Sequence, residues 1–182
     1  MALVYAQNGY TRRMIVSLAL VLTAHAQKST EFKGVVFEAP VKWNQKTIQG
    51  AMMMSPSDLK PDEIISIVFS EARPIEKNLR QDFVNYVGGI ESKLKVISKG
   101  KITTWKRDSL DVLKMPGTID GGARGTFTAL YQVVGNGKTV VACSVIFKGE
   151  SLPARYQKPI ASMLMTIRPK GSAKPKSEKQ VG

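Results

Sequence analysis

The segment GTFTALYQVVGNGKTVVACSVIF, residues 125–147, decides the fold because it has the pattern of two strands joined by a tight turn. Apolar side chains alternate with threonine or glutamine in its first half, and every second residue is apolar from Val141 to Phe147, a period typical of strands. Gly135-Asn136-Gly137 lies between the halves and tolerates the positive φ angles of a hairpin turn. We therefore predict an antiparallel hairpin. Five of its side chains are expected in the core: Phe127, Tyr131, Val141, Val145 and Phe147.

Shorter patterns on the N-terminal side of this hairpin extend the sheet. Alternating or apolar runs predict strands at residues 34–38, 48–54, 63–70, 95–105 and 110–114. Several of these runs are separated by Pro, Gly, Ser and Asp, which are typical turn residues. Connections of that length favour antiparallel pairing between neighbouring strands.

Two amphipathic helices are also expected. Asn78 can cap the first helix, whose apolar residues recur at spacings of three and four from Leu79 to Leu94, although Gly88-Gly89 weakens it. The second helix has Pro153 in its first turn and an apolar stripe that ends at Ile167. The order of elements predicts an α+β fold, a mainly antiparallel β-sheet with two principal helices packed against it.

The chain of 182 residues divides into three parts. Residues 1–26 have the pattern of a signal peptide: Arg12 and Arg13, an apolar run over residues 14–23, and Ala24-His25-Ala26 before the expected cut at Gln27. A buried helix or strand is the alternative. Residues 27–168 are expected to form a single α+β domain. The segment 169–182 is rich in lysine and poor in apolar residues, so we expect a disordered basic tail.

The net charge of +13 arises from 27 basic and 14 acidic residues. Such an excess favours anionic partners, and the candidates are an anionic polymer, an anionic lipid surface or an envelope protein. The charge is equally compatible with a role in solubility alone. The apolar run at the N-terminus is too short to cross a bilayer, so no transmembrane segment is expected in the mature chain. The predicted location is periplasmic or extracellular.

The arrangement resembles the PsbP-like superfamily of small exported domains. An early strand runs into Pro40-Val41-Lys42-Trp43, an amphipathic helix follows the strand at residues 63–70, and the hairpin precedes a helix that ends in Met165-Thr166-Ile167-Arg168-Pro169. The resemblance covers Phe32 to Pro169. It implies a central antiparallel sheet with helices packed against it, and commonly a non-enzymatic binding or accessory role. No binding residue of that family carries over, because no binding motif is present.

Histidine chemistry is excluded from the predicted mature protein. The single histidine of the whole chain, His25, belongs to the predicted signal peptide. Without it, neither a Ser-His nor a Cys-His nucleophile pair can form in the mature protein. Six carboxylates lie in polar segments: Asp58, Asp62, Glu63, Asp108, Asp111 and Asp120. They are expected to be solvated surface charges. We therefore expect no catalytic residue, no metal site and no cofactor.

Basic residues near an aromatic side chain form the candidate anion-binding site. Its members are Lys93, Lys95, Lys99, Lys101, Trp105, Lys106, Arg107 and Arg124. Phosphate contacts and stacking could hold an anionic polymer there, and a strand edge protected by lysines is the alternative. Arg124 belongs to the loop Asp120–Gly125, whose glycines could cradle an anion or simply form a flexible turn.

Sulfur-containing residues suggest core positions. Met52 and Met54 would face one side of a strand and Met53 the other, which favours core filling over copper(I) binding. Cys143 stands among valines and is expected to be a buried, inert thiol.

These observations favour an exported, non-enzymatic binding or accessory domain of the cell envelope, with an anionic partner. The alternative is a histidine-independent envelope enzyme that uses carboxylates. A pocket in which two carboxylates converge would favour the enzyme, and a shallow basic face would favour binding.

Overall fold

The computed structural model describes residues 27–174, so the predicted signal peptide and the last part of the predicted tail lie outside the described residues. Two helices and one 3-10 turn, η1, accompany the strands. The strands are β1 (Gln27–Phe32), β2 (Val35–Pro40), β3 (Trp43–Ile48), β4 (Ala51–Pro56), β5 (Ile65–Phe69), β6 (Arg73–Pro74), β7 (Val96–Lys99), β8 (Thr103–Arg107), β9 (Leu110–Asp120), β10 (Thr126–Gly135), β11 (Thr139–Lys148) and β12 (Arg168–Pro169). The helices are α1 (Leu79–Glu91) and α2 (Ala154–Thr166), and η1 is Gly122–Arg124.

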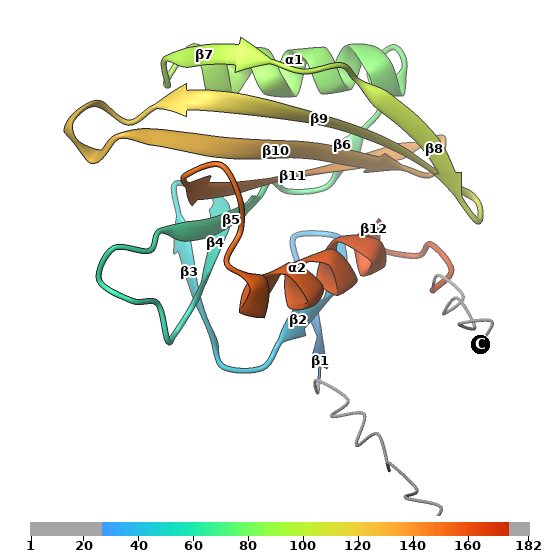
Figure 1. Cartoon of the computed structure of the whole chain (residues 1–182). Coiled ribbons are helices and arrows are strands. Elements are labelled where there is room, and N and C mark those ends of the chain that lie inside the picture. Colours follow the sequence, from blue (N-terminus) through green and yellow to red (C-terminus); the bar gives the residue numbers. More distant parts are fainter. Residues whose placement is uncertain (1–26, 175–182) are drawn as a thin grey trace, which may run out of the picture.

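A large antiparallel sheet forms the centre of the molecule. Its strand order is β3-β4-β5-β11-β10-β9-β7, while β8 also pairs with β9 and β6 with β11. The predicted hairpin is its middle, since β10 and β11 pair from Phe127 opposite Lys148 to Gly135 opposite Val140. α1 covers one face, and α2 lies on the other face together with β1 and β2 (Figure 1). The α+β fold with two principal helices is confirmed.

The hairpin side chains pack in two layers rather than one. All five residues predicted for the core are buried, but Phe127 and Tyr131 face α1, whereas Val141, Val145 and Phe147 face α2. The pairing explains the division, because Tyr131 lies opposite Ser144 and the neighbouring Val145 points to the other face. Both faces of the central strands are therefore covered.

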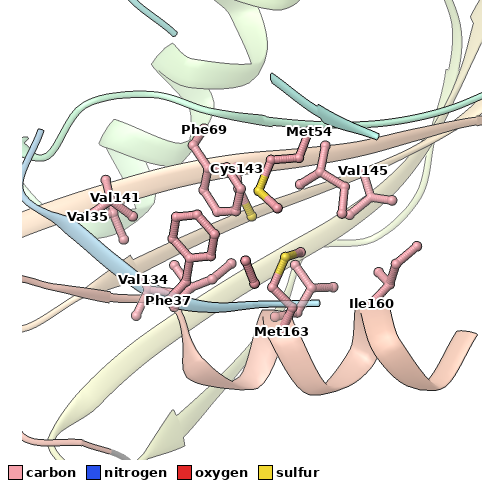
Figure 2. Close-up of a cluster of buried hydrophobic side chains, with 14 of the residues drawn as sticks. Val35, Phe37, Met54, Phe69, Val134, Val141, Cys143, Val145, Ile160 and Met163 are labelled. Atoms are coloured by element: carbon pink, nitrogen blue, oxygen red, sulfur yellow. The ribbon is translucent and has the colours of Figure 1, made fainter. Parts of the chain in front are cut away.

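The layer beneath the sheet is closed by the last elements of the chain. A second, three-stranded sheet in the order β1-β2-β12 lies there beside α2. The Phe37 and Phe69 rings stack with centroids 4.3 Å apart, and Met163 of α2 lies below them (Figure 2). These side chains are almost completely buried. This layer joins the small sheet, the large sheet and α2 into one core.

Two of the predicted strands are interrupted in the structure, one by a hairpin turn and the other by a break. The segment 48–54 contains a turn at Gln49 and Gly50, whose φ angles of 48° and 81° reverse the chain between β3 and β4. The segment 95–105 is broken at Gly100, where a Cβ atom would lie 2.7 Å from a Pro116 side-chain atom. β9 extends six residues beyond the predicted end at Lys114.

Both helices form where the apolar periodicity placed them. The Asn78 side chain caps α1 by accepting a hydrogen bond from the Gln81 backbone N–H at 2.9 Å. α1 continues through Gly88-Gly89 and ends at Glu91. α2 contains Pro159, which has no N–H to donate to the Arg155 carbonyl one turn earlier.

Ordered structure continues past the boundary at residue 168. Pro169 pairs with Val35, and the Lys170 N–H donates to the Gly34 carbonyl at 2.7 Å. Lys174 forms an ion pair of 2.6 Å with Glu38. The prediction of disorder from residue 169 is therefore wrong for residues 169–174, because pairing with β2 was not visible in a segment without apolar periodicity. No helix within residues 27–174 combines the length and the apolar character needed to cross a membrane.

Candidate ligand-binding site

A hollow of about 570 Å³ lies between α1 and the part of the sheet that α1 leaves uncovered. We call it the α1 groove. α1 supplies Asn85, Tyr86, Gly89 and Ile90, and the residues that follow it supply Lys93 and Leu94. The sheet side is formed by Ala51, Val68, Ser70, Arg73, Ser144 and Ile146. Most of this wall is apolar.

The groove results from the way α1 sits on the sheet. α1 packs against β9, β10 and β11, where Phe83 and Val87 are buried. Beyond β11 the sheet continues with β5 and β4, so the outward side chains of Val68 and Ala51 have no helix above them. Gly89 faces this space, and a Cβ atom added there would meet nothing within 4 Å. The groove is thus open beside the helix.

Polar groups occur at defined points of the wall. The Tyr86 hydroxyl donates to Ser144 Oγ at 3.2 Å, and burial raises the pKa of this phenol. Arg73 pairs with the buried carboxylate of Asp82 at 2.7 Å, so its charge is balanced by α1 itself. Lys93 is exposed and forms no ion pair with any residue of the described chain. The arrangement suits a ligand with an apolar body and an anionic end.

The predicted basic residues are spread along one edge of the sheet. β7 and β8 both pair with the outer side of β9, with Lys95 beside Asp120 and Lys106 opposite Asp111. Asp111 and Asp120 are nine positions apart in the extended strand β9, a span of about 30 Å. Lys95, Lys99 and Lys106 form ion pairs with Asp120, Glu91 and Asp111 at 2.9, 2.7 and 3.9 Å. Lys101 is exposed in the loop between the two strands. Most of the lysines along this edge are therefore already paired with carboxylates.

Arg107 and Trp105 do not belong to that surface. Arg107 is only 7% exposed, and its guanidinium donates to the carbonyl of Leu164 at 3.0 Å and to that of Ile167. It satisfies carbonyls at the C-terminal end of α2 that have no helical partner. Trp105 is partly buried against the core beneath the sheet. In a strand, Arg107 shares the face of Trp105 rather than that of Lys106, so strand periodicity could have revealed its burial.

The glycine-rich loop before β10 satisfies its own backbone groups. Gly121 N–H donates to Gly125 O at 2.9 Å, and Gly122 N–H donates to Asp120 Oδ1 at 2.8 Å. The hydrogen bond from Lys95 and that from Gly122 lower the pKa of Asp120. A carboxylate therefore occupies the position that an anion would take, and Arg124 is exposed beside it.

The sulfur atoms lie in the core beneath the sheet. Met52 and Met54 are buried there, and Met54 lies next to Cys143 (Figure 2). Burial raises the pKa of Cys143 to about 12, as expected for an inert thiol. Residues 27–174 hold no group of three or more His, Cys, Asp or Glu side chains that could bind a metal ion.

Two adjacent carboxylates, Asp62 and Glu63, line a smaller polar hollow with Lys148. Glu63 accepts hydrogen bonds from the Lys60 backbone N–H and from Arg155, and these contacts lower its pKa. A carboxylate so engaged is a poor proton acceptor near neutral pH. The hollow gives no specific support to carboxylate catalysis.

Comparison with known proteins defines the fold and not the function. No family model matches the chain, and no curated protein matches it. The solution structure of cyanobacterial PsbP (CyanoP) from Synechocystis sp. PCC 6803 is similar, with a TM-score of 0.53 and 12% identity over 82% of this chain and 95% of that one. A crystal structure from Bacteroides thetaiotaomicron VPI-5482 has a TM-score of 0.54 and 14% identity over 80% of this chain. This chain spans about half, 49%, of that second protein. The chain thus has a PsbP-like fold, distantly related in structure to CyanoP.

Proposed function

We propose that this protein is a non-enzymatic binding domain of the cell envelope, and that the α1 groove takes up an amphipathic anion. The observation that carries the proposal is the open, largely apolar hollow beside α1, at whose rim Lys93 has no ion-pair partner among residues 27–174. Its volume of about 570 Å³ lies within the range of small-molecule sites. An accessory role without chemistry is also compatible with the PsbP-like fold, although fold likeness is only an analogy for function.

The apolar part of the ligand is expected to lie on the sheet. Val68, Ile146 and Ile90 line the hollow from three different elements, β5, β11 and α1. Removing such surface from water is favourable by about 25 cal/mol per Å². A ligand that covers these side chains would complete the layer that α1 begins.

The anionic end of the ligand is expected at Lys93. Arg73 on the same wall is already paired with Asp82, whereas Lys93 has no charged partner in the part of the chain that the structure describes. The net charge of +13 attracts anions to the molecule as a whole. Charge at the rim would orient the ligand, and the apolar wall would supply most of the affinity.

Export is part of the proposal and rests on the sequence. The paired arginines, the apolar run and Ala24-His25-Ala26 support cleavage before Gln27. Mass spectrometry of protein recovered from an envelope fraction is expected to give an N-terminus at Gln27. An uncleaved chain in the cytosol would contradict this part.

The binding proposal can be tested with the fluorescent anion anilinonaphthalene sulfonate on folded protein. We expect its emission to rise on addition of the protein and to fall when decanoate competes. Leu94→Ser removes apolar wall and is expected to weaken binding about tenfold. Lys93→Gln removes the rim charge and should weaken binding by about threefold, the order of an exposed charge pair.

Two matched variants serve as controls. Ile97 is 57% exposed on β7 and does not line the groove, so Ile97→Ser should bind the probe like the parent protein. Lys95→Gln removes a lysine that is paired with Asp120. Equal losses in groove and control variants, or no probe binding by the parent, would contradict the proposal. Salt-dependent retention on heparin that survives Leu94→Ser but is lost in Lys99→Gln/Lys101→Gln would instead place an anionic partner on the β7–β8 edge.

A further inference from the structure

We propose that a second hollow, between Trp43 and the first turns of α2, binds a pyranose ring of an oligosaccharide. This hollow has a volume of about 550 Å³, and Arg155, Tyr156 and Pro159 of its lining belong to α2. α2 lies on the side of the sheet away from α1 (Figure 1). The hollow is formed by the β2–β3 connection, the β4–β5 connection and α2. The lining residues that matter here are Lys42, Trp43, Ser57, Asp58, Arg155 and Tyr156. The site is independent of the α1 groove.

The walls are held in place without a ligand. Trp43 and Tyr156 meet edge to face, with ring centroids 6.3 Å apart and planes at 89°. The Tyr156 hydroxyl donates to Asp58 Oδ1 at 2.8 Å, which ties α2 to the β4–β5 connection. Ser57 N–H donates to Lys42 O at 3.2 Å and closes the β2–β3 connection onto the same site. A preformed site of this kind loses little conformational entropy on binding.

Arg155 also stabilises the wall of the hollow, through contacts with Tyr156 and Glu63. Its guanidinium lies 4.4 Å from the centroid of the Tyr156 ring and forms an ion pair with Glu63. The contact with Glu63 contributes to the raised pKa of Arg155. The charge of Arg155 is therefore balanced by Glu63, so Arg155 does not offer a free cation to a ligand.

Several hydrogen-bonding groups at the wall remain unused within the described chain. Trp43 Nε1–H and the Lys42 ammonium group are donors, and Asp58 Oδ2 is an acceptor. None of these three atoms takes part in a hydrogen bond or an ion pair within residues 27–174. A ligand that uses them must both donate and accept hydrogen bonds.

A sugar ring matches this combination. Its hydroxyl groups donate and accept, so they can meet Asp58 and Lys42 together, while the C–H face of the ring packs on the indole of Trp43. A proline-rich peptide would place an apolar ring on Trp43 but offers mainly carbonyl acceptors, which leave the Asp58 carboxylate without a donor. The pairing of an aromatic face with both a donor and an acceptor therefore favours the sugar.

The test uses the two tryptophans of the chain, Trp43 and Trp105. In the variant Trp105→Phe only Trp43 fluoresces. We expect its emission to shift on titration with cellotetraose or chitotetraose, tetrasaccharides whose rings have flat apolar faces. The reciprocal variant Trp43→Phe, in which only Trp105 reports, should show no shift.

Affinities of wall variants then locate the ligand. Isothermal titration calorimetry is carried out with the tetrasaccharide that shifts the Trp43 emission. Asp58→Asn is expected to bind it about tenfold more weakly than the parent protein, because a hydrogen bond to a charged group is lost. Asp58→Asn keeps an oxygen for Tyr156, so the fold should be retained. Lys42→Asn should weaken binding a few fold, and Asn tolerates the positive φ of 64° at this position.

Matched controls are Asp62→Asn and Lys46→Asn, which lie outside the hollow and should bind like the parent protein. The proposal is overturned if Trp43 emission in the Trp105→Phe variant does not respond to either tetrasaccharide at millimolar concentration. It is equally overturned if Asp58→Asn and Lys42→Asn bind as tightly as the two controls.

Discussion

The two faces of the central sheet differ in how completely they are covered. Below the sheet, α2 and the β1-β2-β12 sheet enclose a layer that includes Phe37, Phe69 and Met163. Above it, α1 buries Phe83 and Val87 but ends beside an open groove. One face therefore carries the larger share of the closed core, and the other combines a smaller core with accessible apolar surface. The difference suggests that changes should be costly below the sheet and tolerated at the groove.

The largest effect is expected for Phe37→Ala. Phe37 is fully buried and stacks on Phe69, so truncation should lower the free energy of unfolding by about 3 to 5 kcal/mol. Urea denaturation followed by circular dichroism measures the change. Val41→Ala is the control, because Val41 is 52% exposed and its truncation should change stability by less than about 0.5 kcal/mol. Equal effects of the two would mean that the lower layer is not closed.

The second largest effect is expected for Arg107→Met. This change keeps much of the side-chain volume but removes the donors to Leu164 and Ile167, so unfolding should require about 1 to 3 kcal/mol less. Lys106→Met is the matched control, since Lys106 is exposed on the other face of the same strand. Thermal unfolding of both variants distinguishes a buried anchor from a surface charge. A stable Arg107→Met protein would show that α2 does not depend on these hydrogen bonds.

A smaller and opposite effect is expected at the groove. Gly89→Ala should raise the free energy of unfolding by about 0.5 to 1 kcal/mol, because a helical glycine is replaced where the added Cβ meets no atom. Gly117→Ala is the contrasting variant, since its Cβ would lie 2.9 Å from the Tyr131 ring. Denaturant midpoints should move in opposite directions for the two. A loss of stability in Gly89→Ala would show that the groove is more tightly packed than its hollow indicates.

The smallest effect concerns pH. Contacts from Lys60 and Arg155 lower the pKa of Glu63 below its ordinary value of 4.5. The stabilisation from Glu63 is therefore complete above about pH 4.5 and disappears as the pH falls through the lower, folded-state pKa. The melting temperature of the parent protein should exceed that of Glu63→Gln at pH 7, and the two should converge in acid. Asp62→Asn, which removes the adjacent carboxylate, should not reproduce this pH-dependent difference.

The hairpin shows what local sequence can specify. Alternating residues and Gly135-Asn136-Gly137 encode β10 and β11 directly, and the two-sided burial follows from the apolar residues on both faces of β11. The turn at Gln49 and Gly50 was missed because glutamine at a positive φ carries no turn signature. β12 was missed because its two residues pair only with β2, more than a hundred residues earlier.

The candidate sites depend still more on distant pairing. The α1 groove exists because β5 lies beside β11, which brings Val68 next to Ile146. Nothing in the local sequence of either strand specifies that neighbour. The basic residues were read as a cluster because they are close in sequence, but an extended edge separates Lys95 from Lys106. The position of Lys93 at the groove is determined by the end of α1.

The position of α2 and β12 in the chain has a consequence for how the protein is made. These elements, residues 154–169, follow β11 in the chain and therefore emerge after it in synthesis, yet they cover the largest apolar layer. A growing chain that has completed β11 still leaves Phe37, Met54 and Cys143 without the cover of α2, so this layer cannot close until α2 and β12 have been made. Until then the apolar side chains of β2 and β5 are uncovered, and transiently exposed apolar surface of this kind favours aggregation.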